Sequence, residues 1–431
     1  MKILYAVQVS NTTKMPDGSM KWLLRNDACV NIMRGILIAV LKKKPQWQFV
    51  VKLPRLKDIA DMKSYAELFP EEIRDNIMIY EDDIPISPVT SRFHFDFLRR
   101  RKEFLINPFL HGIDVMINDE NTHTMSWKVV FHDLGLSIPM ISTNYFFDNP
   151  IGKKTPKGVW YFDRQVESFI HSEITAFQCE ATKDETIRVL DQHLTRKGDY
   201  TMHWKPSIWG IGCSATEVLD KRIQAFEFHS LSLRPIIYFG NRITETAGRY
   251  TNWDDFAYGI GKLLAIKDHT QFSAYMLDPT RKVTREQQNV IDDGSDHRIT
   301  LLHLNREQYL GFIRGQHISC NLFVNEVHGG VTHAEAMLAG NLIICPRVNN
   351  YKIKIEKYAK NYPLFVKHKG FKIDTTDLAK KMHLALTMPK AEQLKWRKML
   401  VKAAMENETY ESAAPRIIAD ITTASKMELM P

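Results

Sequence analysis

The sequence lacks an apolar run of about 18 residues, the length that a helix needs to cross a bilayer, so we expect no segment to span a membrane. It begins directly with a strand-like run rather than with a cleavable signal, which favours a cytoplasmic protein. Cysteines are few and without the paired spacing of a disulfide framework, and several lie in apolar segments. We therefore interpret these residues as reduced core cysteines: Cys29, Cys179, Cys213, Cys320 and Cys345.

The chain also has no internal repeat, low-complexity tract or long linker, and no cluster of His, Cys or carboxylates with metal-ligand spacing. We predict no metal site and no tightly bound cofactor, although a divalent ion held partly by a substrate diphosphate would leave little trace in the sequence. A chain of 431 residues is too long for one ordinary core and fits two domains of about 200 residues each.

The first half of the chain alternates strand-like and helix-like segments. Residues 1–9 form a strand-like run, residues 11–18 a polar turn, and apolar residues then recur at helical spacing over residues 30–41 before a strand at residues 49–51. The pattern continues with a strand at residues 114–117, a helix at 127–134 and strands at 138–142 and 175–179. Such alternation predicts a parallel α/β sheet that binds ligands outside the carboxyl ends of its strands.

Residues 321–350 carry the densest set of functional signals. They predict a buried strand at residues 322–324, a tight turn at Gly329 and Gly330, a helix over residues 332–339 and a second strand at residues 342–344. Unpaired amides at such a helix start, together with the helix dipole, suit a diphosphate. Carboxylates beside it, Glu326 and Glu335, would accept hydrogen bonds from sugar or ribose hydroxyls.

This segment resembles the donor-binding motif of the large retaining class of GT-B glycosyltransferases, in which two glutamates and a glycine-rich turn bind a sugar nucleotide. The run from Glu335 to Gly340 matches the second half of that motif closely. The first half departs from it, because eight residues rather than seven separate Glu326 from Glu335. An ordinary strand-turn-helix unit with a surface glutamate is the alternative. The resemblance assigns the donor to Gly329, Gly330, Val331, Thr332 and Glu335.

Further stretches follow the family's order. The run at residues 235–242 is similar to the strand whose Gly-Arg end clamps the donor diphosphate, which implies that role for Arg242, with Arg249 as the second cation. Solvated loop arginines are the alternative. A helix from residue 307 to residue 319 and the run at residues 408–414 resemble the helix before the motif strand and the family's C-terminal helix.

The resemblance implies a GT-B fold, an α/β architecture of two Rossmann-like domains that face each other across a cleft. We expect an acceptor-binding domain at residues 1–207, a nucleotide-sugar-binding domain at 208–410, and a C-terminal helix at 411–431 that returns to the first domain.

The sequence departs from the family at a position implied in catalysis, because Asn144 stands where many retaining members carry a histidine. An asparagine can hydrogen-bond a sugar hydroxyl but cannot act as a base. Asp119, Glu120 and His123 follow the neighbouring strand and would approach the same cleft, or else they are loop residues without chemistry. The implied front-face transfer needs positioning and stabilisation of the leaving diphosphate by Arg242, Arg249 and helix amides, with Glu326 and Asn144 beside the reacting sugar.

A net charge of +8 and a pI near 9.0 favour an acidic partner without choosing between nucleic acid and anionic membrane. Two basic runs in the expected acceptor domain concentrate this charge, and the run at residues 92–102 interleaves aromatic residues. Their cations would contact DNA phosphates while aromatics stack on an extruded base, or the run would dock on a membrane, or it is a solvated helix face. The predicted nucleic-acid contacts are Lys42, Lys43, Lys44, Arg99, Arg100, Arg101 and Lys102.

The leading hypothesis is therefore a glycosyltransferase that moves a sugar from a UDP-linked donor to a hydroxyl of a 5-hydroxymethylated pyrimidine, such as hydroxymethylcytosine, in double-stranded DNA. Usage of Met, Lys, Asn and aromatic residues with only 20 glycines is similar in style to bacteriophage proteins, which would act in the host cytoplasm. The alternatives are a transferase acting on a cell-surface polysaccharide or lipid precursor, and a non-catalytic DNA- or sugar-binding protein on the same scaffold.

Overall fold

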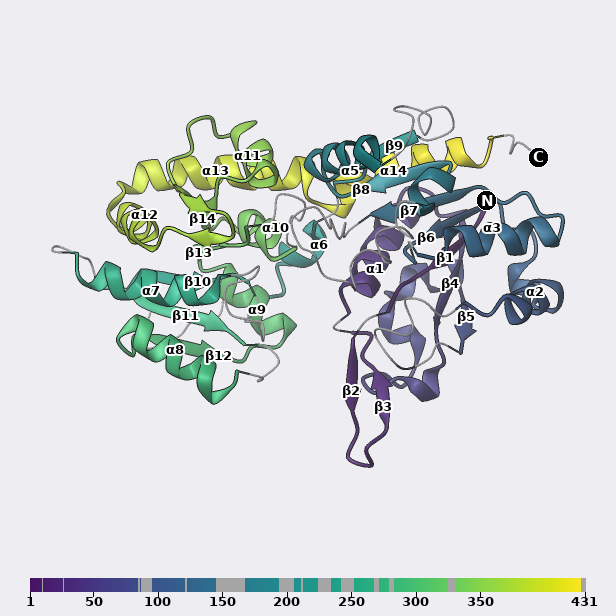
Figure 1. The fold of residues 1–431 in the computed structure, drawn as a ribbon, viewed down its shortest axis with the longest axis horizontal. Helices are drawn as coiled ribbons and strands as arrows, with labels where there is room; N and C mark the ends of the chain where they lie inside the picture. Colours follow the sequence, from purple (N-terminus) through teal and green to yellow (C-terminus); the bar gives the residue numbers. More distant parts are fainter. Residues whose placement is uncertain are drawn as a thin grey trace. The chain divides into compact units, whose positions relative to one another are not determined.

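The chain divides into two compact units, each built around its own parallel sheet (Figure 1). Unit 1 comprises residues 1–210 with 413–431, and unit 2 comprises residues 211–412. The computed structural model describes residues 1–431 except 10, 26, 84–85, 87–94, 121, 145–166, 194–204, 211, 224–233, 242–251, 267–270, 279–282, 325–330 and 428–431.

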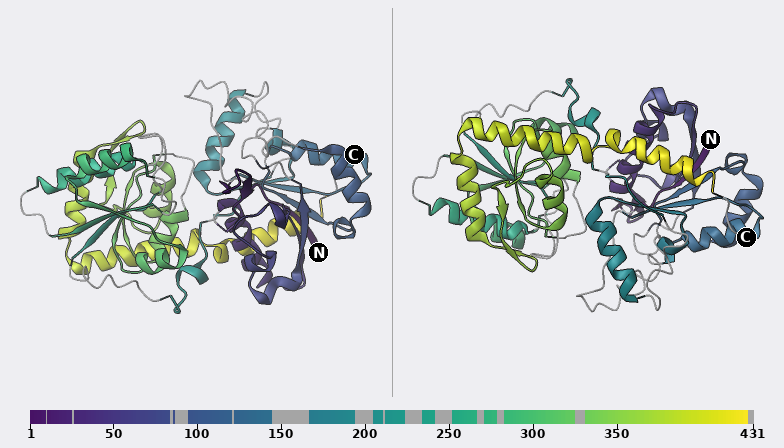
Figure 2. Two further views of the ribbon diagram at one scale, coloured as in Figure 1. Left: turned by 90° about the horizontal axis from the view of Figure 1, so that it is seen from below. Right: turned by 90° about the horizontal axis from the view of Figure 1, so that it is seen from above.

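Unit 1 contains a seven-stranded sheet of order β5-β4-β1-β6-β7-β8-β9, in which every neighbouring pair is parallel. Helices cover both faces of this sheet (Figure 2). The strands are β1 (Lys2–Ala6), β4 (Gln48–Pro54), β5 (Ile77–Asp82), β6 (Val115–Asn118), β7 (Met140–Asn144), β8 (Ile174–Phe177) and β9 (Lys205–Ile208). The helices are α1 (Ala28–Leu41), α2 (Phe97–Ile106), α3 (Thr124–Asp133), α5 (Glu180–His193), the 3-10 turns η1 (Leu56–Asp58), η2 (Tyr65–Leu68), η3 (Glu71–Asn76) and η4 (Pro108–Leu110), and α14 (Tyr410–Ala424).

Helix α1 shows why these segments fold as they do. Asp27 caps it by accepting hydrogen bonds from the amides of Cys29 and Val30, which satisfies donors that the first turn leaves unpaired. Apolar residues occupy most of its turns, and the helix is buried on the side that meets the sheet.

Helices α2 and α3 pack against each other through aromatic side chains. Trp127 stacks on Phe131 at 5.9 Å between ring centroids, and Phe104 meets both rings edge to face. All three rings are buried, so one side of each helix belongs to the core of unit 1.

Unit 2 has a six-stranded parallel sheet of order β12-β11-β10-β13-β14-β15. Its strands are β10 (Ile236–Phe239), β11 (Ser273–Leu277), β12 (Ile299–Leu302), β13 (Ile318–Cys320), β14 (Leu342–Pro346) and β15 (Phe365–Val366), and β16 (His368–Lys369) pairs with β17 (Lys372–Ile373) as a short hairpin. Its helices are α6 (Ala215–Val218), α7 (Trp253–Leu264), α8 (Arg285–Ser295), α9 (Arg306–Ile313), α10 (Val331–Leu338), α11 (Asn349–Glu356), α12 (Thr375–Thr387) and α13 (Lys390–Asn407).

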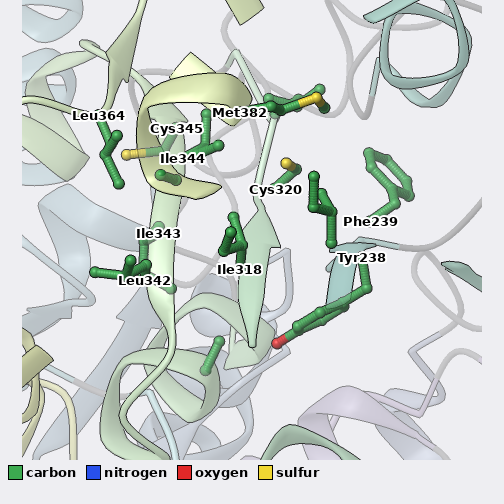
Figure 3. Packing of buried hydrophobic residues seen from close by; sticks show 14 of the residues in the cluster. Tyr238, Phe239, Ile318, Cys320, Leu342, Ile343, Ile344, Cys345, Leu364 and Met382 are labelled. Carbon is green, nitrogen blue, oxygen red and sulfur yellow. The ribbon is translucent and has the colours of Figure 1, made fainter. Parts of the chain in front are cut away.

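The core of unit 2 lies on both faces of its central strands (Figure 3). Ile318 and Ile343 come from neighbouring strands, and Tyr238 joins them from β10. Such strands are apolar on both sides because helices cover both faces of a parallel sheet.

Three local predictions were wrong. The strand before α10 is β13 rather than residues 322–324, and the preceding helix α9 ends at Ile313 rather than at residue 319. Gln316 has a φ of 55°, a left-handed conformation that a helix cannot continue through, so the chain turns there and enters β13 early. The polar region at residues 11–18 is a hairpin of β2 (Thr12–Lys14) and β3 (Met20–Trp22), turned at Gly18 with a φ of 84°.

The C-terminal helix α14 begins in unit 2 and continues in unit 1. Within unit 1, Asp420 accepts hydrogen bonds from the Ser207 hydroxyl and from the Trp209 indole, the latter at 2.9 Å. These bonds fasten the end of the chain beside β9. None of the helices in the described ranges is long and apolar enough to cross a bilayer.

Candidate functional site

The order of the unit 2 sheet reverses between β10 and β13, and ligands of such sheets bind outside the carboxyl ends of the strands at this point. Gly240 and Asn321 directly follow these two strands. A Cβ atom on Gly240 would lie 2.7 Å from the Asn321 side-chain oxygen, so the close approach of the two segments requires glycine. The Asn321 oxygen is buried and has no hydrogen-bond partner among the described residues.

Glu335 lies in α10, the helix that follows β13, and its side chain is 1% exposed. Its Oε1 accepts a hydrogen bond from Arg306 Nη2 at 2.5 Å, and the same guanidinium donates to both carboxylate oxygens of Glu217 at 3.0 and 3.1 Å. Glu335 Oε2 is buried and accepts no hydrogen bond from any described residue. One oxygen of this buried carboxylate is therefore an unsatisfied hydrogen-bond acceptor, which calls for a donor that the described residues do not supply.

The hydroxyls of Tyr309 and Tyr410 lie within electrostatic range of this carboxylate. Burial raises the pKa of the Tyr309 hydroxyl well above its usual range, and the nearby Glu335 charge raises it further. Burial and the same charge also raise the pKa values of Tyr410 and the Cys213 thiol. All three groups stay neutral at ordinary pH, so Arg306 is the cation that balances Glu335.

A second buried polar group lies two residues before Glu335 in α10. His333 is 1% exposed, packs against the Tyr351 ring at 4.3 Å, and has no described partner for either ring nitrogen. Burial, with the Lys354 charge, lowers the pKa of His333 to about 3, so the imidazole is neutral. Lys354 itself donates a 2.7 Å hydrogen bond to Glu408, the residue that begins the predicted C-terminal motif.

Three of the five predicted donor contacts, Val331, Thr332 and Glu335, lie in α10. Val331 and Thr332 form its first turn and are half-buried. Five predicted residues lie outside the described part of the chain: Arg242, Arg249, Glu326, Gly329 and Gly330.

In unit 1 the strand order reverses between β1 and β6, and Asp119, Glu120 and His123 follow β6 at this switch point. All three are buried. Asp119 accepts hydrogen bonds from the hydroxyls of Tyr5 at 3.3 Å and Thr143 at 2.5 Å. The structure thus brings the three polar residues to the sheet edge where α/β domains bind ligands. Asn144 ends β7 at the same edge.

A buried ion-pair network lies beside this switch point. Lys52, only 1% exposed, pairs with Glu120 and with Asp82 at 3.2 Å, and Asp82 also pairs with Arg100. Burial alone would raise the pKa values of Asp82 and Glu120, but the Lys52 charge, assisted by Arg100, holds both below their ordinary values. Both carboxylates are therefore ionised in the folded unit.

The predicted nucleic-acid contact of Arg100 is corrected by this network. Arg100 is 6% exposed, and its guanidinium bonds to Asp82 and Tyr80 inside the unit, so it presents no surface to a phosphate. Arg99 is 26% exposed and bonds to Glu103 at 2.7 Å. Arg101 and Lys102 are exposed, and Arg101 pairs with Asp133 at 2.7 Å.

The other basic run follows α1. Lys42 and Lys43 are exposed and Lys44 is half-buried, whereas the neighbouring Trp47 is buried and unavailable for base stacking. These lysines precede β4, so they lie at the amino end of the strands, the edge opposite to the switch-point residues.

Three residues with prominent contacts were not predicted from the sequence. Arg306 begins α9, 29 positions before the glutamate that it holds, and Glu217 lies 89 positions before Arg306. Lys52 is the single charged residue of an otherwise largely apolar strand, Gln48–Pro54. A lone charge in such a strand could have indicated a buried lysine with a carboxylate partner. Nowhere in the described ranges do three His, Cys, Asp or Glu side chains gather in a way that could hold a metal ion.

Solved structures similar to this chain include one described as trehalose-6-phosphate from E. coli bound with UDP-2-fluoro glucose, at 13% identity and a TM-score of 0.64, covering 99% of this chain and 100% of that chain. A UDP-forming α,α-trehalose-phosphate synthase from Burkholderia xenovorans matches at 12% identity and a TM-score of 0.63, covering 99% of each chain. A trehalose-6-phosphate synthase studied for glycosyltransfer with retention matches at 12% identity and a TM-score of 0.64, covering 98% of this chain and 99% of that chain. No protein-family model matches the sequence, and a search of curated proteins gives no match.

These likenesses extend over both units, and they show that the chain has the GT-B fold. The predicted fold class is confirmed.

Proposed function

We propose that this protein is a glycosyltransferase that uses a nucleoside diphosphate sugar as donor, with the donor bound by unit 2. The observation that carries this proposal is the Glu335 carboxylate of α10, which is buried, is held through Oε1 by Arg306, and has no hydrogen-bond partner at Oε2 among the described residues. Neighbouring structures of the same fold that are described as UDP-forming or as bound to a UDP sugar support UDP as the nucleotide.

Glu335 suits a ribose rather than a phosphate. A carboxylate repels phosphate oxygens, whereas a pair of vicinal hydroxyls can donate to its open oxygen. Arg306 keeps the carboxylate in place and balances its charge without occupying Oε2. The diphosphate would instead meet the amides of the first turn of α10, where Val331 and Thr332 lie, because their N–H groups are unpaired in the helix and the helix dipole attracts anions.

Donor cleavage in this scheme breaks the bond between the sugar anomeric carbon and the diphosphate oxygen. The acceptor hydroxyl oxygen forms the new bond, its proton passes to the departing phosphate, and helix amides with Arg242 and Arg249 stabilise the charge that develops there. We propose retention of configuration, as studied in a structural neighbour, and Asn144 as a hydrogen-bonding residue rather than a base.

For the acceptor we propose a small hydroxylated molecule bound by unit 1, as the trehalose-phosphate synthases among the neighbours favour. The polar residues after β6 are the candidates to position it, since they lie at the ligand edge of the sheet. Asp119 is the leading one, because carboxylates accept from sugar hydroxyls.

A modified DNA base is the second candidate acceptor, and the exposed cations Lys43, Arg101 and Lys102 would be its phosphate contacts. If they contact phosphates, the affinity for duplex DNA should fall steeply with salt, and Lys43→Glu with Lys102→Glu should shallow the salt slope by roughly one unit per lost contact. Reversal of Arg100 is unsuitable for this test, because it would leave Asp82 buried against a second carboxylate.

The deciding experiment incubates the purified protein with UDP-sugars and three acceptor sets: hexoses and hexose phosphates, duplex DNA with ordinary or 5-hydroxymethylated pyrimidines, and lipid-linked sugars. Mass spectrometry then locates any added sugar, and NMR of the product gives the anomeric configuration. Binding of UDP without cleavage of any donor would indicate a non-catalytic protein on the same scaffold. A Glu335→Gln variant that binds UDP as tightly as the wild type would contradict the proposed donor site.

A further inference from the structure

The outward side of α2 carries an unusual concentration of exposed apolar residues. Sixteen large apolar side chains are exposed among the described residues, and five of them fall within residues 97–109, on α2 and the turn η4 that follows. We call these five the α2 surface: Phe97 (45% exposed), Leu98 (79%), Leu105 (62%), Ile106 (65%) and Phe109 (45%). A contiguous set of this kind marks an interaction site more often than scattered single residues do.

Helical spacing places three of these residues together, whereas Phe97 precedes the buried Phe104 by two turns and Phe109 lies in η4. Leu98, Leu105 and Ile106 are seven and eight positions apart, which is two turns of helix, so they lie on one side of α2. The opposite side holds Arg100 and Phe104, which are buried against β5 and α3. The apolar residues of the α2 surface are thus not a poorly packed part of the core, because the core side of the helix is separately filled.

The charged side chains of α2 also differ between its exposed side and its buried side. Lys102 lies between the apolar residues, is exposed, and makes no ion pair with any described residue. Glu103 is the single acidic residue of the helix, and it points inward, where it bonds to Arg99 and to the Tyr80 hydroxyl. Arg101 adds a second exposed cation, partly balanced by Asp133. The α2 surface is therefore apolar, with the unpaired Lys102 ammonium among its leucines and isoleucine and the exposed N-cap carboxylate of Asp96 at its amino end.

This combination selects among the possible occupants. A stable protein interface needs about 20–30 residues on each side, whereas the α2 surface offers five apolar residues on one three-turn helix and the next turn. If DNA bound here, the leucines and isoleucine of the α2 surface would remain in water beside the phosphates. Arg99 and Arg100 could not contact the phosphates, because they are paired with carboxylates inside the unit. An anionic bilayer accepts both chemistries, apolar side chains below its phosphates and lysine beside them.

We propose that the α2 surface docks unit 1 on an anionic phospholipid bilayer, with the helix lying in the plane of the headgroups. Leu98, Leu105 and Ile106 enter the boundary between headgroups and acyl chains, and the Lys102 ammonium meets lipid phosphates. This docking does not depend on donor binding by unit 2, so the two proposals can fail separately.

The test is flotation of the full chain with two kinds of vesicle. One contains phosphatidylcholine alone, and in the other about a third of the lipid is phosphatidylglycerol. The wild type should float with the anionic vesicles and more weakly with the neutral ones. Leu98→Gln together with Ile106→Gln should reduce the partition coefficient by at least about tenfold, since each side chain loses much of its transfer free energy. Lys102→Gln should reduce it about fivefold on anionic vesicles and leave it unchanged on neutral ones.

The matched control is Leu384→Gln with Leu394→Gln, which removes two exposed leucines of α12 and α13 in unit 2 at 38% and 49% exposure. It should float like the wild type, and both double variants should retain the wild-type melting temperature and UDP affinity. Equal flotation of the α2 variant and the control would overturn the proposal, as would an absence of wild-type flotation. Loss of self-association in sedimentation, or of DNA binding, in the α2 variant without any vesicle effect would assign the surface to a second copy or to nucleic acid instead.

Discussion

Arg306 and Glu335 form an ion pair with an Nη2 to Oε1 distance of 2.5 Å, in which the glutamate is 1% exposed and the arginine 46% exposed. The guanidinium thus reaches a buried carboxylate from the surface and, through Glu217, ties α9 to α6 and α10. This pair orients the one group of unit 2 on which the proposed donor site chiefly depends.

We expect Glu335→Gln to weaken UDP binding by about 1.5–3 kcal/mol, because a charged acceptor of ribose hydroxyls becomes neutral. Titration calorimetry with UDP measures this loss, and thermal melting checks that the variant folds. Glu356→Gln, which alters a glutamate paired with an exposed arginine of the same unit, should leave the affinity unchanged.

The coupling between Arg306 and Glu335 should be measurable by a double-mutant cycle with Arg306→Gln and Glu335→Gln. We expect about 1–2 kcal/mol in the unfolding free energy of unit 2, at the low end for a buried pair because half of the guanidinium is solvated. The same cycle on Arg347 and Glu356, whose side chains are 58% and 25% exposed, should give less than about 1 kcal/mol. Equal coupling energies in the two cycles would mean that the burial of Glu335 does not strengthen its ion pair with Arg306.

Lys52→Met should destabilise unit 1 by about 3–5 kcal/mol, because it leaves Asp82 and Glu120 ionised and buried with one cation fewer. Urea unfolding followed by the tryptophans of unit 1 measures the change. Lys102→Met, on the exposed side of α2, is the matched control and should change stability by less than about 0.5 kcal/mol. A loss for Lys52→Met no larger than that of the control would show that the network is solvated.

His333 should make unit 2 less stable in acid. Its pKa is about 3 when folded, against 6.5 for an ordinary histidine, so the unfolded chain binds the proton first as the pH falls. The stability contribution of the neutral imidazole is complete above pH 6.5 and is lost progressively between pH 6.5 and about pH 3.

His333→Phe should therefore flatten the dependence of the unit 2 melting temperature on pH within this window. His368→Gln, at a histidine near the surface of the same unit, serves as the control and should preserve the wild-type slope. An unchanged slope in His333→Phe would place the acid sensitivity in other groups.

Local patterns predicted most elements of the fold. The helical spacing at residues 30–41 corresponds to α1, the apolar runs at residues 49–51 and 342–344 lie in β4 and β14, and the helix expected from residue 332 is α10. These predictions succeeded because side-chain periodicity reports directly on which faces of an element are buried. The strand expected at residues 322–324 failed because buried apolar residues also occur in the segment after a strand, and Leu322 is fully buried there.

By itself, the sequence determined that this chain forms alternating strands and helices in parallel sheets and that Glu335 lies near the start of a helix. Only the tertiary structure decided which charges meet: Arg306 holds Glu335, and Lys52 and Arg100 are buried with Asp82. It also decided that apolar side chains of α2 face outward. Spacing along the chain governs local conformation, whereas ion pairs across 18 to 89 residues depend on the order of strands in a sheet. For that reason the sequence showed that Arg100 belongs to a basic run, but its burial depended on Asp82 at the end of β5.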